Sequence, residues 1–328
     1  MTEEKKYISE IWVYCEIRED ALTTGAKELL GKSQELAKEA GCIVAAVLFA
    51  GDKKKLMKEA AAFGGEKIYR FPACREEIQS RALVHKMTGK RPWAFLFPAS
   101  STGRMVAAQL SVRMKTGLTA DCIELTVESG YLKQTRPAFG GSLMADIFCR
   151  HSYPQMATVQ KGVFPLPQPD FDRKGEVISC SGSGILSPLK VLEKKTETKE
   201  EKNLTDAKIV LAGGLGLGSK GNFILLKRAA EQIGAAPAAS RAAVNAGLAP
   251  YAWQVGQSGK TIRPSIYIAC GISGAVQHLA GIQGAGCIVA VNPDRKAPIF
   301  AHADIGIVAD AEDFLRELIA STEGIVQD

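Results

Sequence analysis

Apolar positions along the first half of the chain follow two different periodicities. Short, mostly apolar runs are typical of strands buried on both faces, and longer segments with apolar residues three or four apart predict helices. The strand-like runs are residues 11–16, 43–49, 67–71 and 93–97. The helix-like segments are residues 23–40, 54–63 and 105–116. Because the two kinds alternate, the pattern predicts a mostly parallel, doubly wound α/β domain.

The second half repeats the alternation. Its strand-like runs are residues 208–212, 265–269, 287–291 and 305–309. Its main helix-like segments are residues 223–233 and 311–320, with a shorter one carrying Gln277 and His278. Glycines or small polar residues lie next to most of the runs. Since parallel strands end at the same edge of a sheet, we expect these turns to line up there and to form a ligand site.

The length of 328 residues fits two domains of ordinary size. Residues 190–206, KVLEKKTETKEEKNLTD, form a run of mixed charge that predicts a solvated linker. We therefore expect an N-terminal α/β domain at residues 1–189 and a C-terminal domain at residues 207–328. Within the first, residues 123–164 predict short strands and loops that extend its sheet.

Composition excludes several classes of function. The net charge of +6 arises from 41 basic and 35 acidic residues that are scattered along the chain, which argues against a nucleic-acid partner. The eight cysteines form no CxxC pattern, so we expect neither a metal nor an iron–sulfur site, and free thiols in a reducing cytosol. No segment resembles a signal peptide or a membrane span, and we expect a cytoplasmic protein without membrane insertion.

Two turns have the residue types of a phosphate site. Residues 216–221 match GxGxxG between a strand and a helix, but no acidic residue follows about 20 residues later to bind a ribose. This favours a nucleotide near a glycine turn over an NAD fingerprint. In the first domain, residues 100–104 (SSTGR) either bind a phosphate at a helix N-terminus or simply cap that helix.

The remaining candidate residues follow strands of the second domain. The glycines Gly256, Gly259, Gly271 and Gly274 either let an anion approach bare backbone N–H groups or serve loop structure. Arg241 has no acidic neighbour in sequence, so it is either a partner for an anion or a solvated surface residue. His278 offers a hydrogen bond or a positive charge, unless it is structural. No GxSxG or HExxH motif supports hydrolysis, and the pattern indicates a cradle for a dinucleotide-like anion.

These residues also resemble a known family. The segment YIACGISGAVQHLAGIQGAGCIVAVN, residues 267–292, is similar to the signature of the electron transfer flavoprotein alpha subunit. The shorter segments GGLGLGSKGNF, SRAAV, QVGQSGK, APIF and GIVAD occur in the family's order, and TRPAFGGS and the TGR turn fit it in the first domain. The resemblance covers most of the chain.

The resemblance implies a heterodimer with a beta subunit, for which the first domain is the scaffold. It also implies one FAD, held mainly by a Rossmann-like C-terminal domain, and electron transfer from a dehydrogenase such as acyl-CoA dehydrogenase to a downstream acceptor. Activity would then require both partners, and a flavin-bifurcating variant would depend on a second FAD in the beta subunit. The alternatives are an NAD(P)-dependent dehydrogenase, which lacks its ribose acid and catalytic base here, and a non-redox nucleotide-binding module.

The resemblance implies specific cofactor contacts. The FAD-binding residues would be Ser240, Arg241, Val255, Gly256, Gln257, Ser258, Ser273, Gly274, Ala275, Val276, Gln277, His278, Asn292 and Asp310. Three of these would tune the flavin: Arg241 would lie against the isoalloxazine ring, Ser258 would donate toward N5, and His278 would approach the C2 carbonyl. Asn292 and Asp310 would serve the adenosine end. Leu215 replaces an arginine that is usual in the family, and we expect weaker FAD binding as a result.

Overall fold

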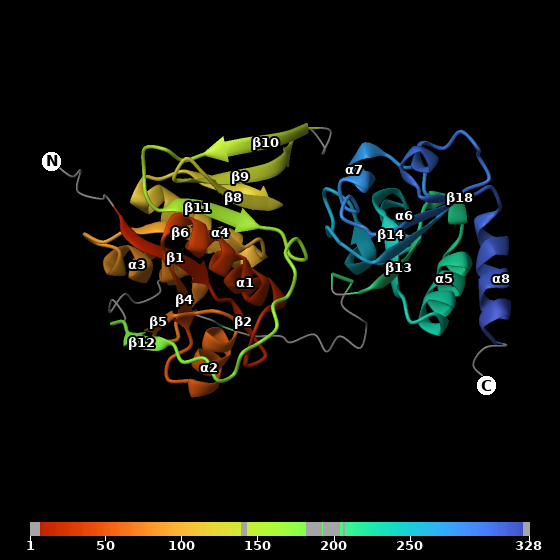
Figure 1. Cartoon of the computed structure of the whole chain (residues 1–328). Helices are drawn as coiled ribbons and strands as arrows, with labels where there is room; N and C mark the ends of the chain where they lie inside the picture. The colour runs from red at the N-terminus through yellow and green to blue at the C-terminus, as the bar shows by residue number, and fades with distance from the viewer. Residues whose placement is uncertain (1–6, 139–142, 182–191, 193–203, 206, 324–328) are drawn as a thin grey trace. The chain divides into compact units, whose positions relative to one another are not determined.

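The chain folds into two compact units, residues 1–193 and 194–328. Figure 1 shows the computed structural model, which describes residues 7–138, 143–181, 192, 204–205 and 207–323. The linker expected at residues 190–206 falls almost entirely outside the described residues. Each unit is built around its own sheet, and the two are described separately below.

The first unit contains a seven-stranded, fully parallel sheet in the order β12-β5-β4-β1-β6-β11-β7. Its strands are β1 (Ile8–Tyr14), β4 (Ile43–Phe49), β5 (Lys67–Phe71), β6 (Pro92–Pro98), β7 (Leu118–Cys122), β11 (Gln155–Val159) and β12 (Glu176–Ser179). The helices are α1 (Thr24–Ala40), α2 (Lys54–Ala62), α3 (Glu76–Lys86) and α4 (Ser101–Met114), and a small hairpin joins β2 (Ile17–Arg18) to β3 (Ala21–Leu22).

Both faces of this sheet are covered. Along β1, Ile11 and Val13 point into a core shared with α1 and α2, whereas Trp12 and Tyr14 point into a second core shared with α3 and α4. Successive side chains of a strand face opposite sides, so a strand buried on both sides must be apolar throughout. This is why the uninterrupted apolar runs correctly predicted a parallel sheet.

Residues 123–148 differ from the expectation that they extend the main sheet. The strands β8 (Glu124–Glu128), β9 (Tyr131–Ala138) and β10 (Leu143–Phe148) form a separate antiparallel sheet. The turn between β8 and β9 has positive φ at both Ser129 and Gly130, 52° and 81°. Such a two-residue turn matches the twist of paired antiparallel strands and folds the chain back on itself.

The second unit contains a six-stranded parallel sheet in the order β15-β14-β13-β16-β17-β18. The strands are β13 (Ile209–Gly213), β14 (Ala236–Ser240), β15 (Gln254–Val255), β16 (Ile266–Cys270), β17 (Ile288–Val291) and β18 (Ile305–Ile307). The α-helices are α5 (Lys220–Gln232), α6 (Arg241–Asn245), α7 (Val276–Leu279) and α8 (Ala311–Glu323), and the 3₁₀ helices are η2 (Leu215–Leu217), η3 (Tyr251–Trp253) and η4 (Pro298–His302). Numbered from β13, the order is 3-2-1-4-5-6, the order of the Rossmann fold.

One face of the second sheet packs against α5, α6 and α8, and Figure 1 shows α5 and α8 side by side. The other face, which includes Tyr267 and Ala269 of β16, packs against Leu279 of α7 and Ile299 of η4. That face is covered by short helices and loops. The expected doubly wound, two-unit α/β architecture is confirmed.

Several elements were not predicted from the sequence, among them α3 and β14. Helix α3 buries the polar residues Gln79 and Ser80 as well as apolar ones, and Gln79 accepts a hydrogen bond of 2.7 Å from the Tyr14 hydroxyl. Strand β14 consists of alanines, a proline and Ser240, which lack the branched side chains typical of strands.

Among the described residues, no helix has the length and hydropathy needed to cross a membrane.

Candidate cofactor site

The predicted site residues of the second unit all follow strands at one edge of its sheet. Ser240 ends β14, Val255 ends β15, and Asn292 comes directly after β17. The turn after β16 contains Ser273–Ala275, and Asp310 follows β18. Because every strand of this sheet is parallel, its six carboxyl ends meet here. The strand order reverses between β13 and β16, and such a switch point is where open α/β sheets form ligand crevices.

The turns after β13 and β16 pack directly against each other at the switch point. Gly214 N donates to Cys270 O at 2.8 Å, and Gly216 N donates to Gly271 O at 3.1 Å. A Cβ at Gly214 would lie 2.0 Å from Gly271 O. The GxGxxG segment thus forms the η2 turn and only then enters α5, where the Ser219 hydroxyl caps the helix by accepting from Asn222 N at 3.1 Å.

The turn after β15 is fixed to α7. Gln257 N donates to Gln277 O at 2.7 Å, and a Cβ at Gly256 would lie 2.8 Å from the same oxygen. Gly274 is similarly restricted, because its φ is +88° and a Cβ there would lie 2.4 Å from Ile299 N. Of the two interpretations of the turn glycines, loop packing thus has direct structural support at these positions.

Arg241 is the first residue of α6 and is exposed. It makes no hydrogen bond or ion pair with any other described residue. The preceding residue, Ser240, caps the helix by accepting from Ala243 N at 3.4 Å. The guanidinium is therefore held at the carboxyl edge of the sheet with its donors available to a ligand.

The Ser258 hydroxyl is also oriented by a neighbour. It accepts a hydrogen bond of 3.1 Å from Gln254 Nε2, and its carbonyl accepts one of 3.3 Å from the Tyr251 hydroxyl. Because Gln254 supplies the donor, the proton of the Ser258 hydroxyl remains available. Gln254 was not among the predicted site residues; it is the first residue of β15, and its burial became evident only in the structure.

His278 is buried, with 6% of its surface exposed. Nε2 lies 2.8 Å from the hydroxyl of Tyr267, while Nδ1 is buried and has no hydrogen-bond partner among the described residues. Burial lowers the pKa of His278 to about 4, and the backbone of Val255 opposes this shift in part without reaching hydrogen-bonding geometry. The expectation that His278 contributes a positive charge is therefore wrong for this structure: the ring is neutral at pH 7 because a buried imidazolium would lose its hydration.

Asn292 and Asp310 already make bonds within the protein. Asn292 Nδ2 donates to Ile272 O at 3.1 Å and its Oδ1 accepts from Asp294 N at 3.0 Å. Asp310 Oδ1 accepts from Glu312 N at 2.8 Å at the start of α8. Both side chains thus order the loops at this edge, and each keeps spare hydrogen-bonding capacity for a ligand.

In the first unit, the turn at residues 100–104 is a helix cap. The Ser100 hydroxyl accepts from Gly103 N at 2.9 Å, and Arg104 pairs with Asp121 at 2.9 Å. A Cβ at Gly103 would lie 2.0 Å from Pro98 O, so glycine is needed for close packing. The capping interpretation of this turn is the one that the structure supports.

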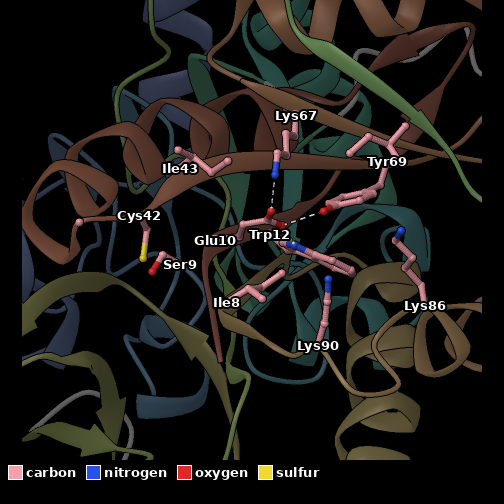
Figure 2. A pocket seen from close by; sticks show the side chains of 12 residues that line it. Ile8, Ser9, Glu10, Trp12, Cys42, Ile43, Lys67, Tyr69, Lys86 and Lys90 are labelled. Atoms are coloured by element: carbon pink, nitrogen blue, oxygen red, sulfur yellow. Dashed lines mark hydrogen bonds and ion pairs between the residues drawn. The ribbon is translucent and has the colours of Figure 1, made fainter. Parts of the chain in front are cut away.

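A separate cavity of about 550 Å³ lies in the first unit, at the amino ends of β1, β4 and β5. Figure 2 shows the carboxylate of Glu10 in this cavity with its hydrogen-bond donors. Glu10 accepts from Trp12 Nε1 at 2.7 Å, from the Tyr69 hydroxyl at 2.9 Å and from Lys67 Nζ at 2.9 Å. Both oxygens are thus satisfied within the protein, and we interpret the cluster as a link between β1 and β5.

Together, the Rossmann strand order and the switch-point turns define a two-unit α/β protein with a nucleotide-cofactor site in its second unit. Family comparison gives the particular class. Residues 11–182 match the electron transfer flavoprotein domain, and residues 203–283 match the electron transfer flavoprotein FAD-binding domain. The chain therefore belongs to the electron transfer flavoprotein family, among its alpha subunits and FixB proteins.

Individual relatives match along nearly their whole length. The chain is 41% identical over 326 residues to protein FixB of Clostridium saccharobutylicum, covering 96% of this chain and 97% of the relative. It is 41% identical over 309 residues to electron transfer flavoprotein subunit alpha of Thermoanaerobacterium thermosaccharolyticum, covering 92% and 94%. It is 40% identical over 331 residues to electron transfer flavoprotein subunit alpha of Megasphaera elsdenii, covering 96% of this chain and 97% of the relative.

FAD is accordingly the cofactor of the second unit, and the residues present fit it. The unpaired Arg241 and the available proton of Ser258 suit an anionic, hydrogen-bonding ligand. Large apolar side chains are exposed beside the same turns, with 60% of Val276 and 69% of Tyr251 accessible. An aromatic ring system would cover such surface. The FAD-binding match ends at residue 283, so Asn292 and Asp310 lie outside it.

Proposed function

We propose that this chain is the alpha subunit of a heterodimeric, cytoplasmic electron carrier. With a beta subunit, it would accept electrons from a dehydrogenase, such as an acyl-CoA dehydrogenase, and pass them to a downstream acceptor. The matched family domains and the subunit names of the relatives support this proposal. FAD supplies the electron-accepting chemistry, and this chain's residues bind and orient it.

The proposed contacts are the fourteen residues predicted from the sequence resemblance. The observation that carries them is their convergence from successive strands on one edge of the second sheet. In this proposal, Ser258 donates toward flavin N5 and His278 lies near the C2 carbonyl. Asn292 and Asp310 hold the loops that receive the adenosine end.

Of the three proposed tuning residues, Arg241 alone carries a formal positive charge, because His278 is neutral. Reduction adds negative charge to a flavin, and a nearby guanidinium stabilises that charge. We therefore assign to Arg241 the main electrostatic effect on the cofactor's reduction potential.

We also propose that the edge of the antiparallel sheet contributes to the beta-subunit interface. Leu143 and Met144 on β10 are 59% and 58% exposed, and β10 is an edge strand that pairs with β9 on one side and with no other described strand. Exposed apolar side chains on an unpaired strand edge are a liability in an isolated protein and are typical of surfaces that bind a partner.

The proposal is tested with the chain co-expressed with its beta-type subunit. We expect flavin absorbance in the purified complex. In Arg241→Met we expect the potential of the first one-electron reduction of the flavin to fall by roughly 60–120 mV, the equivalent of losing about 1.5–3 kcal/mol of charge-assisted interaction. Lys227→Met is the matched control, since it removes a positive charge from α5 that lies near Glu231. Equal potentials for Arg241→Met and the wild-type complex would contradict the assignment.

The same preparation distinguishes the simple carrier from the bifurcating variant. One FAD for each heterodimer is expected for the carrier, whereas two FAD molecules and reduction by NADH would indicate bifurcation. A colourless complex would refute the proposed function itself.

A further inference from the structure

Tyr267 is an unusual residue for its position. It is the second residue of β16, is fully buried and lies on the face of the sheet that packs against α7. Its hydroxyl makes a hydrogen bond of 2.8 Å with Nε2 of His278, and no other hydrogen bond from that hydroxyl reaches a described residue. The sequence indicated only an apolar strand here, although a buried phenol usually has a hydrogen-bond partner.

Neither group of this pair is ionised at pH 7. Burial raises the pKa of Tyr267 well above its usual value, and burial lowers that of His278 to about 4. No charged side chain contributes to the shift of His278. The phenol and the imidazole therefore hold one proton each, and only two arrangements of these protons are compatible with a hydrogen bond between them.

The two arrangements leave different groups unsatisfied. If Nε2–H donates to the phenol oxygen, the phenol proton and the Nδ1 lone pair are both buried without partners. If the phenol donates to Nε2, only Nδ1–H lacks a partner, and an acceptor near the ring already exists in the backbone of Val255, whose effect on the pKa has the sign expected of a carbonyl. An unsatisfied buried polar group costs about 1–3 kcal/mol, which favours the second arrangement.

We infer that Tyr267 is a positioning residue that fixes His278 as the neutral, Nδ1-protonated tautomer. The ring is thereby held between α7, on which His278 lies, and the end of β15, where Val255 precedes the turn with Gln257 and Ser258. Within the proposed function, on which this part of the inference rests, His278 acts on a bound flavin as a neutral hydrogen-bonding group and leaves the charge to Arg241.

The tautomer is measured on the chain with its beta subunit by nitrogen NMR after labelling of histidine. The chain has four histidines, and the loss of one signal in His278→Gln assigns that of His278. At pH 7 we expect the chemical shift of Nδ1 to be that of a protonated ring nitrogen and the chemical shift of Nε2 to be that of an unprotonated one. An Nε2-protonated ring or an imidazolium would overturn the inference.

Tyr267→Phe tests the cause, because it removes the donor and keeps the ring. We expect the His278 population to shift toward the Nε2-protonated tautomer and its pKa to rise. Tyr251→Phe is the matched control, since within the described part of the chain the hydroxyl of this exposed residue hydrogen-bonds to the Ser258 carbonyl and not to His278. It should leave the His278 nitrogen shifts unchanged. An unchanged pattern in Tyr267→Phe would overturn the role of Tyr267.

If Tyr267→Phe does not fold, the wild-type spectrum still decides the tautomer. The nitrogen shifts do not depend on electron transfer. A colourless complex with the expected tautomer would refute the proposed function alone, whereas a flavin-containing complex with the other tautomer would refute the inference alone.

Discussion

A single buried ring, His278, couples the stability of the second unit to pH. Its pKa is about 4 in the folded chain and 6.5 in an unfolded one, so the unfolded state binds more protons between these values. The free energy of unfolding therefore contains the full contribution of His278 above pH 6.5, and this contribution is lost as the pH falls toward 4. The 2.5-unit difference corresponds to about 3 kcal/mol.

The predicted outcome is a difference between two pH profiles. Urea unfolding of the wild-type chain should lose about 3 kcal/mol more stability between pH 6.5 and pH 4 than that of His278→Gln. His302→Gln, which replaces an exposed histidine of the same unit, should follow the wild-type profile. Parallel profiles for wild type and His278→Gln would show that the ring is not held neutral.

Leu215 offers a second test at the scale of one residue. It lies in η2 directly after β13, at the switch point, and 53% of its surface is exposed. Leu215→Arg would bring a guanidinium to the turn where the family usually has arginine, and we expect FAD to bind about tenfold more tightly, equivalent to about 1.4 kcal/mol. Flavin release measured by fluorescence gives the affinity.

The control for that substitution is Leu215→Gln, which removes the exposed apolar side chain without adding charge. A similar gain in FAD affinity in both variants would show that removing the exposed leucine, and not adding a positive charge, causes the effect. No gain in Leu215→Arg would contradict the expectation that leucine at this position weakens FAD binding.

At the scale of elements, the turns at the carboxyl edge depend on close backbone contact. Gly274→Ala combines a φ of +88° with a Cβ placed 2.4 Å from Ile299 N, so we expect a loss of at least about 3 kcal/mol in urea unfolding and loss of bound flavin. Gly218→Ala has a similar φ of +72° but meets no atom within 4 Å. It should cost only about 1–2 kcal/mol, and equal losses in the two variants would contradict the packing argument.

At the scale of the whole molecule, association with the beta subunit should depend on β10. Leu143→Ser combined with Met144→Ser should weaken the heterodimer at least tenfold in a titration of the purified subunits, because apolar anchors carry much of the energy of an interface. Val112→Ser is the matched control, since Val112 on α4 is 77% exposed. Unchanged affinity in the double variant would place the interface elsewhere.

The sequence alone determined the architecture and the location of the site. The apolar runs such as residues 43–49 must lie in covered parallel strands, and parallel strands place their following turns at one edge. The candidate site residues occupy contiguous motifs after those strands, and the structure brings these motifs together at that edge. Elements with weak patterns were missed: α3 buries polar residues, and β14 is built from small ones.

Tertiary structure decided what the individual side chains do. The charge of His278, the donor on Gln254 and the bond from Tyr267 depend on burial and on side-chain geometry, which no local pattern encodes. The separate sheet of β8–β10 likewise depends on which strands pair. Periodicity records whether a position is buried, but protonation and hydrogen bonding are set by the atoms that burial brings into contact.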